Sequence, residues 1–294
     1  MLKVLVPVLA ILLTGAAHAQ AVRLDGDQQM LLINPYGGLP GRWLSCVERC
    51  TGADEVSATQ TALLRVGAGG SRFAWTVAGD PEASRQLNTL VYRAEYQQTN
   101  TATTVILTSL EPFRGMRLIH RYTLVREGHT LSASLQMPPG ATLELAGGED
   151  LVGTRLPGFG SFYSYARAVR VDAGGQLELT GDGDATGTGR QSVPGEWAGL
   201  RGRFWTVLLQ PKDAVQVSAI ETAPDQPTLS IRRDSAGGGS LDLKIYAGPV
   251  IATELGAVAP ELRGMMYASL WGWLRALAFG MHWLLGQLQQ LVGN

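Results

Sequence analysis

Short apolar runs that alternate with polar residues fill most of the chain between Val22 and Pro249. Side chains of a β-strand point alternately to opposite faces, so this period of two predicts strands buried on one face. Glycine, proline or asparagine separates most of the runs, and no helical period of useful length interrupts them. The clearest predicted strands span residues 71–79, 89–98, 103–111, 116–128, 130–137, 204–211, 214–222, 227–234 and 240–248. This pattern is typical of a mainly β protein, either a sandwich or a barrel.

Two glycine-rich breaks punctuate the pattern. The segment NPYGGLPG has Gly37 and Gly38 where a sharp turn needs a positive φ, and it predicts a turn between two early strands. The segment RDSAGGGS, residues 233–240, predicts a hairpin-type connection between the last two strands.

The period changes at Pro249. Residues 250–264 read as a short helix that stops before Pro260, because a residue that precedes proline is disfavoured in the helical conformation. From Met265 to Asn294 a long amphipathic helix is expected, with apolar side chains at steps of four and three residues. Its apolar stripe is Leu270, Leu274, Leu277, Met281, Leu284, Leu288 and Leu291.

Three interpretations compete for this terminal helix. It could be docked on the protein core, it could span a membrane, or it could lie in the membrane interface. Arg275 and the glutamines near the end argue against a span, which needs ~20 mostly apolar residues. An interfacial helix is favoured because tyrosine and tryptophan settle at the depth of the lipid headgroups. The expected membrane-interface residues are Tyr267, Trp271, Trp273, Arg275 and Trp283.

The first nineteen residues have the form of a cleavable secretory signal. Lys3 precedes an apolar run from Val4 to Leu13, and small residues flank His18 at Ala17 and Ala19. The run is short for a membrane span, so cleavage after Ala19 is favoured over a retained anchor. The sequence therefore predicts three parts: the signal at 1–19, a β domain at 20–250 and a C-terminal helical segment at 251–294.

Export changes the interpretation of the two cysteines. In an oxidising compartment Cys46 and Cys50 can form a disulfide that closes a small loop, and two free thiols are the alternative. The neighbourhood offers too few further ligands for a metal site.

Charge and motif content exclude several functional classes. The formal net charge is −1, from 24 basic and 25 acidic residues, so the chain lacks the basic footprint of a nucleic-acid-binding protein. Asp182 and Asp184 resemble the start of a calcium loop, but Val193 stands where the EF-hand pattern requires glutamate. No nucleophile motif or phosphate-binding loop is present. We therefore expect no enzymatic activity, cofactor or metal.

A second function remains open on the glycine-rich middle of the chain. Phe159, Phe162, Tyr163 and Tyr165 lie close together in sequence, and aromatic rings of this kind could stack on sugar rings in a ligand or partner groove. The alternative prediction is therefore a periplasmic carbohydrate-binding or carbohydrate-active protein.

Motifs in the C-terminal third carry a resemblance to a known family. A Gly-Glu-Trp segment leads into an aromatic strand that ends in proline, Tyr-Ala-Gly-Pro precedes a short helix that ends at Ala-Pro, and the chain closes on Val-Gly-Asn. These positions are Trp197, Phe204, Pro211, Tyr246, Gly248, Pro249, Leu255, Ala259, Pro260, Val292, Gly293 and Asn294. This part of the chain resembles the periplasmic domain of the YidC-type membrane protein insertases. A looser match runs upstream to about residue 22.

The resemblance implies a β-supersandwich, with two antiparallel sheets packed face to face and two C-terminal α-helices, the last amphipathic. It also implies a non-enzymatic role at the periplasmic face of the inner membrane, in membrane protein insertion, folding or contact with the translocon. The implied partners are the membrane surface, accessory subunits of the Sec translocon and substrate membrane proteins.

Two departures from the family qualify this expectation. The family begins with an uncleaved membrane helix, where this sequence has a signal-like segment. The family's membrane helices would begin at Val-Gly-Asn, where this sequence ends. A stand-alone relative of the periplasmic domain is the leading expectation, and a truncated or split half of an insertase is the alternative.

Overall fold

The computed structural model describes most of the β-rich body and parts of the C-terminal segment. The described residues are 21–50, 60–64, 72–147, 166–179, 190–192, 194–223, 226–233, 238–267, 277, 280–281, 284–285 and 287–288. The predicted signal, residues 1–19, lies outside them.

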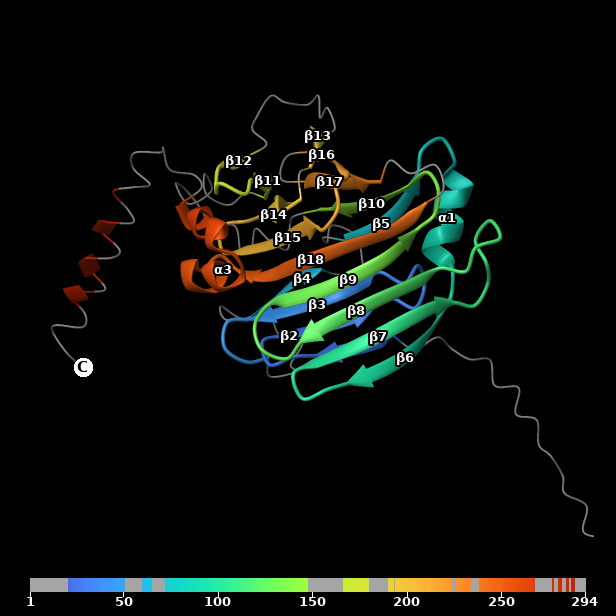
Figure 1. Cartoon of the computed structure of the whole chain (residues 1–294), viewed down its shortest axis with the longest axis horizontal. Coiled ribbons are helices and arrows are strands. Elements are labelled where there is room, and N and C mark those ends of the chain that lie inside the picture. Colours follow the sequence, from blue (N-terminus) through green and yellow to red (C-terminus); the bar gives the residue numbers. More distant parts are fainter. Residues whose placement is uncertain are drawn as a thin grey trace, which may run out of the picture.

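One large antiparallel sheet of nine strands runs the length of the body (Figure 1). Each of its neighbouring strands is antiparallel to the next, so the polypeptide folds back and forth across it. In spatial order the strands are β12 (Leu177–Leu179), β11 (Arg167–Val171), β14 (Trp197–Arg201), β15 (Trp205–Pro211), β18 (Gly239–Pro249), β9 (Thr130–Met137), β8 (Ile119–Val125), β7 (Ala102–Ser109) and β6 (Tyr92–Gln98).

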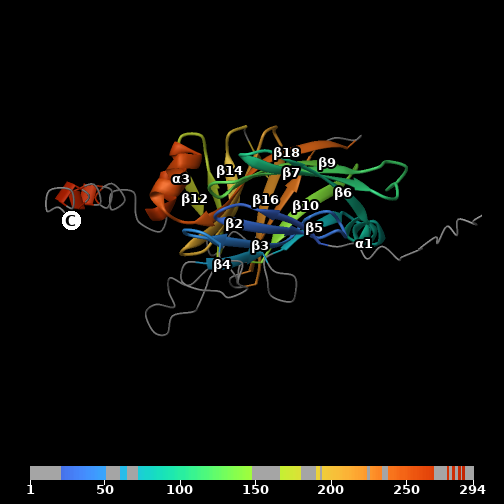
Figure 2. The ribbon, with the colours of Figure 1, turned by 90° about the horizontal axis from the view of Figure 1, so that it is seen from below.

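Two smaller antiparallel sheets lie against the large one and form the second layer of the sandwich (Figure 2). The four-stranded sheet has the order β1 (Val22–Asp25), β2 (Gln29–Ile33), β3 (Pro40–Cys46) and β4 (Gln60–Leu64). The five-stranded sheet has the order β13 (Arg190–Gln191), β16 (Gln216–Ala223), β17 (Gln226–Arg232), β10 (Ala141–Ala146) and β5 (Arg72–Val77). The predicted mainly β sandwich is confirmed, and its second layer is divided between two sheets.

The alternation in the sequence sorts side chains between the core and the surface. On β8, His120, Tyr122 and Leu124 are buried, whereas the residues between them reach the surface. The inward residues of all three sheets merge into one apolar cluster, which contains Trp43, Trp75 and Tyr122. Burying these side chains is the main favourable contribution to folding, and it fixes which face of each strand remains available for binding.

The early glycine turn has the predicted conformation and a defined place in the core. Gly37 and Gly38 have φ angles of 78° and 65°, which non-glycine residues rarely adopt. A Cβ atom on Gly38 would lie 2.8 Å from Cδ2 of His120. The turn therefore needs glycine both for its backbone and for the close approach of a buried ring.

One helix in the body was missed by the pattern of apolar residues. Helix α1 spans Pro81–Thr89, and the Asp80 carboxylate accepts a hydrogen bond from the backbone N–H of Ala83 at 2.9 Å. Only Ala83 and Leu87 of this helix are buried, so its apolar stripe is too short to stand out. The Asp-Pro pair at its start is the available signal, because aspartate caps helices and proline favours the first helical position.

The predicted hairpin between β17 and β18 is wrong. Strand β17 pairs with β10 and β16 in the five-stranded sheet, whereas β18 pairs with β9 and β15 in the nine-stranded sheet. The connection therefore crosses between the layers of the sandwich. Alternation shows which residues of a strand are buried, but it does not show which sheet the strand joins.

At the C-terminal end of β18 the chain turns into two short helical elements. Helix α3 spans Ala252–Val258 and ends before Pro260 as expected, and a 3-10 helix, η2, follows over Pro260–Tyr267. The start of the long helix predicted at Met265 is therefore 3-10 in character. Leu255, Leu262 and Met265 pack on Trp197 and Tyr246 in a second apolar cluster at this end of the body.

Candidate functional site

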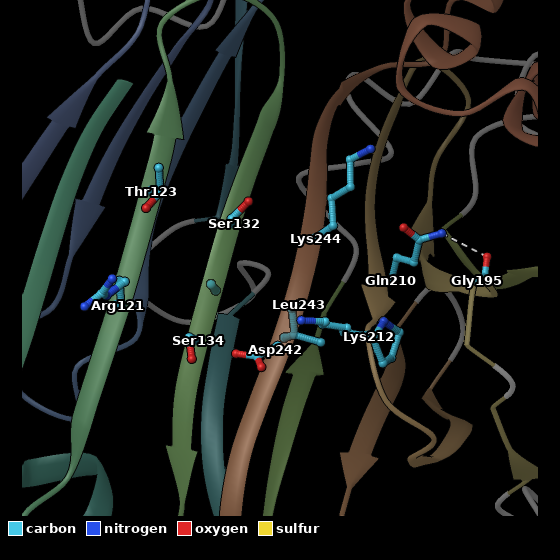
Figure 3. Close-up of a pocket in the computed structure, with 12 residues that line it drawn as sticks. Arg121, Thr123, Ser132, Ser134, Gly195, Gln210, Lys212, Asp242, Leu243 and Lys244 are labelled. Carbon is cyan, nitrogen blue, oxygen red and sulfur yellow. Dashed lines mark hydrogen bonds between the residues drawn. The ribbon is translucent and has the colours of Figure 1, made fainter. Parts of the chain in front are cut away.

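A groove of about 570 Å³ lies on the outward face of the nine-stranded sheet (Figure 3). Strands β8, β9, β18 and β15 form its floor, and Lys212 and Gly195 come from the loops beside them. Alternate residues of these strands point inward and form the sandwich core. The polar residues between them point outward and line the groove.

Strand register arranges the groove side chains in two rows. In one row Arg121 lies opposite Ser134, and Ser134 lies opposite Asp242. Lys212, which directly follows the last residue of β15, completes this row because its backbone N–H donates to the carbonyl oxygen of Asp242. In the other row Thr123, Ser132, Lys244 and Gln210 follow one another across the sheet. Strand β9 therefore contributes short hydroxyl side chains, strand β18 contributes Asp242 and Lys244, and the first row has the cations Arg121 and Lys212 at its ends.

The charges in the groove do not balance. Arg121, Lys212 and Lys244 are cationic, and Asp242 is the only carboxylate among the described residues that line the groove. Neither Arg121 nor Lys212 makes an ion pair within the described residues. The Asp242 carboxylate instead accepts a hydrogen bond from the Ser240 hydroxyl, which donates to its Oδ1 at 3.1 Å. The groove is locally positive on a chain whose formal net charge is −1.

Lys244 also connects the groove to the C-terminal helical elements. Its ammonium donates a hydrogen bond to the carbonyl oxygen of Val258, the last residue of α3, at 3.1 Å, and it lies 5.6 Å from the centre of the Trp197 ring. The Trp197 indole N–H donates to Oε1 of Glu261 in η2 at 3.3 Å. A cation near the C-terminal end of a helix is favourable, so this contact helps to fix α3 on the sheet.

Two histidines are buried away from the groove. Nε2 of His120 lies 3.0 Å from the Tyr92 hydroxyl, and its ring stacks on Trp75 and Tyr92. Nδ1 of His129 lies 3.1 Å from the Ser45 hydroxyl. Burial lowers the pKa of each imidazole to about 4, because the charged form loses its hydration inside the protein. Both rings are therefore neutral near pH 7 and belong to the packed core.

The two cysteines are joined in the structure. Cys46 and Cys50 form a disulfide with a Cα–Cα distance of 5.3 Å. It lies at the end of β3, where buried Cys46 packs with Met30 and Leu44. The disulfide therefore belongs to a small apolar cluster on the four-stranded sheet, and neither cysteine lines the groove.

Most of the other site residues predicted from the sequence lie outside the described residues. This applies to Trp271, Trp273, Arg275 and Trp283 of the expected membrane interface, and to Phe159, Phe162, Tyr163 and Tyr165 of the expected aromatic groove. The backbone of Tyr267 ends η2. Both proposals for these residues remain predictions.

The described positions of the terminal segment are helical and exposed. Leu277, Met281, Leu284 and Leu288 belong to the predicted apolar stripe, and between 45% and 57% of each is exposed. Leu285, beside the stripe, is 60% exposed. These side chains are therefore not packed into the core of the body. No helix among the described residues is long and apolar enough to cross a bilayer.

The sequence interpretation missed the groove on the nine-stranded sheet. Its residues were visible as the polar positions between buried ones, for example Ser132 and Ser134 within TLSASLQM. A polar position on a strand is by default a solvated one, and only the register of four strands brings these residues together. Among the described residues no group of three His, Cys, Asp or Glu side chains forms a candidate metal site.

Comparison with known proteins relates part of the chain to one family. An alignment 105 residues long, which covers 33% of this chain, shows 41% identity to the membrane protein insertase YidC from Methylobacillus flagellatus. The match covers 18% of the length of that insertase. No family model matches the chain. The similarity to YidC therefore extends over about a third of the chain.

Comparison with solved structures gives matches of low sequence identity to this chain. A galactose mutarotase related enzyme from Lactobacillus acidophilus is 10% identical, with a TM-score of 0.41, and the match covers 78% of this chain and 97% of that one. The alpha-N-acetylgalactosaminidase NagBb from Bifidobacterium bifidum is 9% identical, with a TM-score of 0.42, covering 83% and 42% of the two chains.

Proposed function

We propose that this chain is an exported, non-enzymatic relative of the periplasmic part of YidC, held at the periplasmic face of the inner membrane by its terminal helix. There it assists the insertion or folding of membrane proteins, with the β-sandwich presented to translocon subunits or to emerging substrates. The observation that carries the proposal is the exposed apolar stripe at Leu277, Met281, Leu284 and Leu288.

An exposed apolar stripe of this kind is unfavourable in water. Moving one leucine side chain from water into an apolar environment lowers the free energy by about 1.5–3 kcal/mol. A helix with such a stripe and tryptophans at its edges lowers its free energy by lying at the boundary between headgroups and acyl chains. The partial similarity to YidC supports this setting because that protein is itself named as a membrane protein insertase.

The polar groove supports a binding role for the body. Its described lining residues include hydroxyl and cationic side chains but a single carboxylate, Asp242. General acid and base catalysis by two carboxylates would need a second one at this place. The groove is therefore better suited to hold a polypeptide than to transform a substrate.

Binding of purified full-length chain to vesicles of phosphatidylethanolamine and phosphatidylglycerol tests the proposal. Leu284→Gln should lower the vesicle partition coefficient about tenfold, since it removes most of the burial energy of one leucine. Flotation of the vesicles in a density gradient measures the bound fraction.

Leu110→Gln is the matched control for this substitution. Leu110 and Leu284 are each 51% exposed, but Leu110 lies on the body beside β7. The control should leave vesicle binding unchanged. The membrane part of the proposal is wrong if the unaltered chain stays with the soluble fraction, or if both variants weaken binding equally.

A further inference from the structure

We infer that the groove on the nine-stranded sheet is a binding site for an acidic, extended polypeptide segment. The first argument is charge. Arg121 and Lys212 carry positive charges without an ion pair in the described part of the chain, and Lys244 donates to a backbone carbonyl rather than to a carboxylate. Asp242 is the only carboxylate in the part of the lining that the structure describes, so the groove has an excess of positive charge that a partner's carboxylates would neutralise.

The spacing of the cations favours an elongated ligand over a single small anion. Arg121 on β8 and Lys212 beyond β15 are the ends of one row across the sheet, with Ser134 and Asp242 between them. Neighbouring strands are about 4.8 Å apart, so these ends are separated by three spacings, or about 14 Å. The three cationic side chains also extend over separate parts of the groove (Figure 3). One phosphate or carboxylate would not engage all of them.

An extended peptide matches this spacing. Its backbone advances about 3.3 Å per residue, so about four residues span the roughly 14 Å between the backbone positions of Arg121 and Lys212. Carboxylates about four residues apart could each meet one of them. The low floor of Thr123, Ser132 and Ser134 leaves room for the backbone of the peptide, and their hydroxyls can both donate and accept hydrogen bonds.

The contacts of Lys244 give the groove a link to the membrane-directed end of the chain. Its ammonium is shared between the groove lining and the carbonyl of Val258 at the end of α3. An acidic segment in the groove would therefore touch the residue that helps to hold α3 in place. The inference rests on the proposed function for its biological setting, since it names the chemistry of the assisted partner.

Binding of a soluble peptide in the absence of lipid tests the inference separately from the membrane role. The probe is a fluorescein-labelled peptide of about eight residues that alternates aspartate and serine, long enough to cross the row of about 14 Å. Fluorescence anisotropy with the full-length chain should show saturable binding at low salt. It should be lost at about 1 M sodium chloride, where charges are screened beyond about 3 Å. A peptide that alternates lysine and serine should not bind.

Substitutions at the two ends of the row locate the peptide. Arg121→Gln and Lys212→Gln should each weaken binding about two- to fivefold, as expected for one exposed charge pair. Asp242→Asn should strengthen binding about twofold, because it removes the opposing charge and keeps an oxygen that can accept from Ser240. A gain of affinity cannot come from misfolding. Lys244 is left unchanged because it also supports α3.

Arg117→Gln is the matched control, because Arg117 is an exposed arginine outside the groove lining. It should leave the affinity for the acidic peptide unchanged. The inference is overturned if the acidic and basic peptides bind equally, or if the groove substitutions have no more effect than the control. It is also overturned if the peptide does not bind while Arg121→Gln weakens binding to anionic vesicles, since the groove would then hold lipid headgroups. Failure of the peptide to bind would leave vesicle binding through Leu284 intact.

Discussion

Replacement of Trp75 by alanine is expected to lower the free energy of unfolding by about 3–5 kcal/mol. Trp75 is fully buried on β5, and its ring stacks on His120 of the nine-stranded sheet at a centroid distance of 5.8 Å. Its indole N–H donates to the carbonyl oxygen of Gly37 at 3.2 Å. The substitution would open a cavity between the two layers and leave the carbonyl of the glycine turn without this partner. Urea unfolding followed by circular dichroism measures the loss.

Two further substitutions separate the causes of this loss. Trp75→Phe keeps an aromatic ring but removes the hydrogen bond to Gly37, and it should cost about 1–3 kcal/mol. Phe204→Ala, at a ring that is 57% exposed, should change stability by less than about 1 kcal/mol. If Trp75→Ala lowered the free energy of unfolding no more than Phe204→Ala, the claim that Trp75 packs the two layers together would be contradicted.

Acidification from about pH 7 to about pH 5 is expected to lower the free energy of unfolding by about 4 kcal/mol, or about 2 kcal/mol for each buried histidine. Burial lowers the pKa of His120 and His129 to about 4 in the folded chain, whereas an unfolded histidine titrates near its usual value of 6.5. The unfolded state therefore binds protons first as the pH falls. Stability is lost below about pH 6.5 and levels off below about pH 4, where both states are protonated.

The slope of stability against pH identifies the histidines as the cause. Most carboxylates titrate below about pH 5, so the window above this value reports mainly on imidazoles. His129→Gln should reduce the loss between about pH 7 and about pH 5 by half, whatever its effect on absolute stability. Urea midpoints in a series of buffers provide the comparison. A free energy of unfolding that stayed constant over this window would contradict the buried, neutral state of both rings.

The strands were predictable because each carries a strong local signal. On β8 and β9, apolar residues at every second position point to the core, and the structure buries Tyr122, Leu124 and Leu131 accordingly. The glycine turn was equally local, since Gly37 and Gly38 adopt the positive φ angles that only glycine accommodates easily. These features depend on a few neighbouring residues and can therefore be read from the sequence.

The arrangement of the strands depends on contacts between distant residues. Strands β17 and β18 are neighbours in sequence but belong to different sheets, which the alternation of either strand does not reveal. The groove has the same origin. Arg121 and Lys212 are far apart in sequence and reach one row only through the pairing of β8, β9, β18 and β15. For this reason the sequence indicated the fold class but not the groove.

The terminal helix is the feature on which the proposed function depends. Its apolar stripe was evident from spacing alone, and the described leucines on it are exposed. Exposure argues against the docked core helix among the three interpretations, since a docked stripe would be covered by the body. Placement of this helix in the membrane interface is a proposal that needs a measurement of depth.

Spin labels on opposite sides of the helix provide that measurement most directly. Leu284→Cys and Gln290→Cys can be labelled selectively because Cys46 and Cys50 are bridged in the structure. In the helix predicted from the sequence the two positions are about one and two-thirds turns apart, so they would face different sides of it. With vesicles present, we expect the label at 284 to collide with oxygen and to be protected from a water-soluble nickel complex, and the label at 290 to behave in the opposite way. Equal access of the nickel complex to both labels, or protection of both from both reagents, would contradict an interfacial helix.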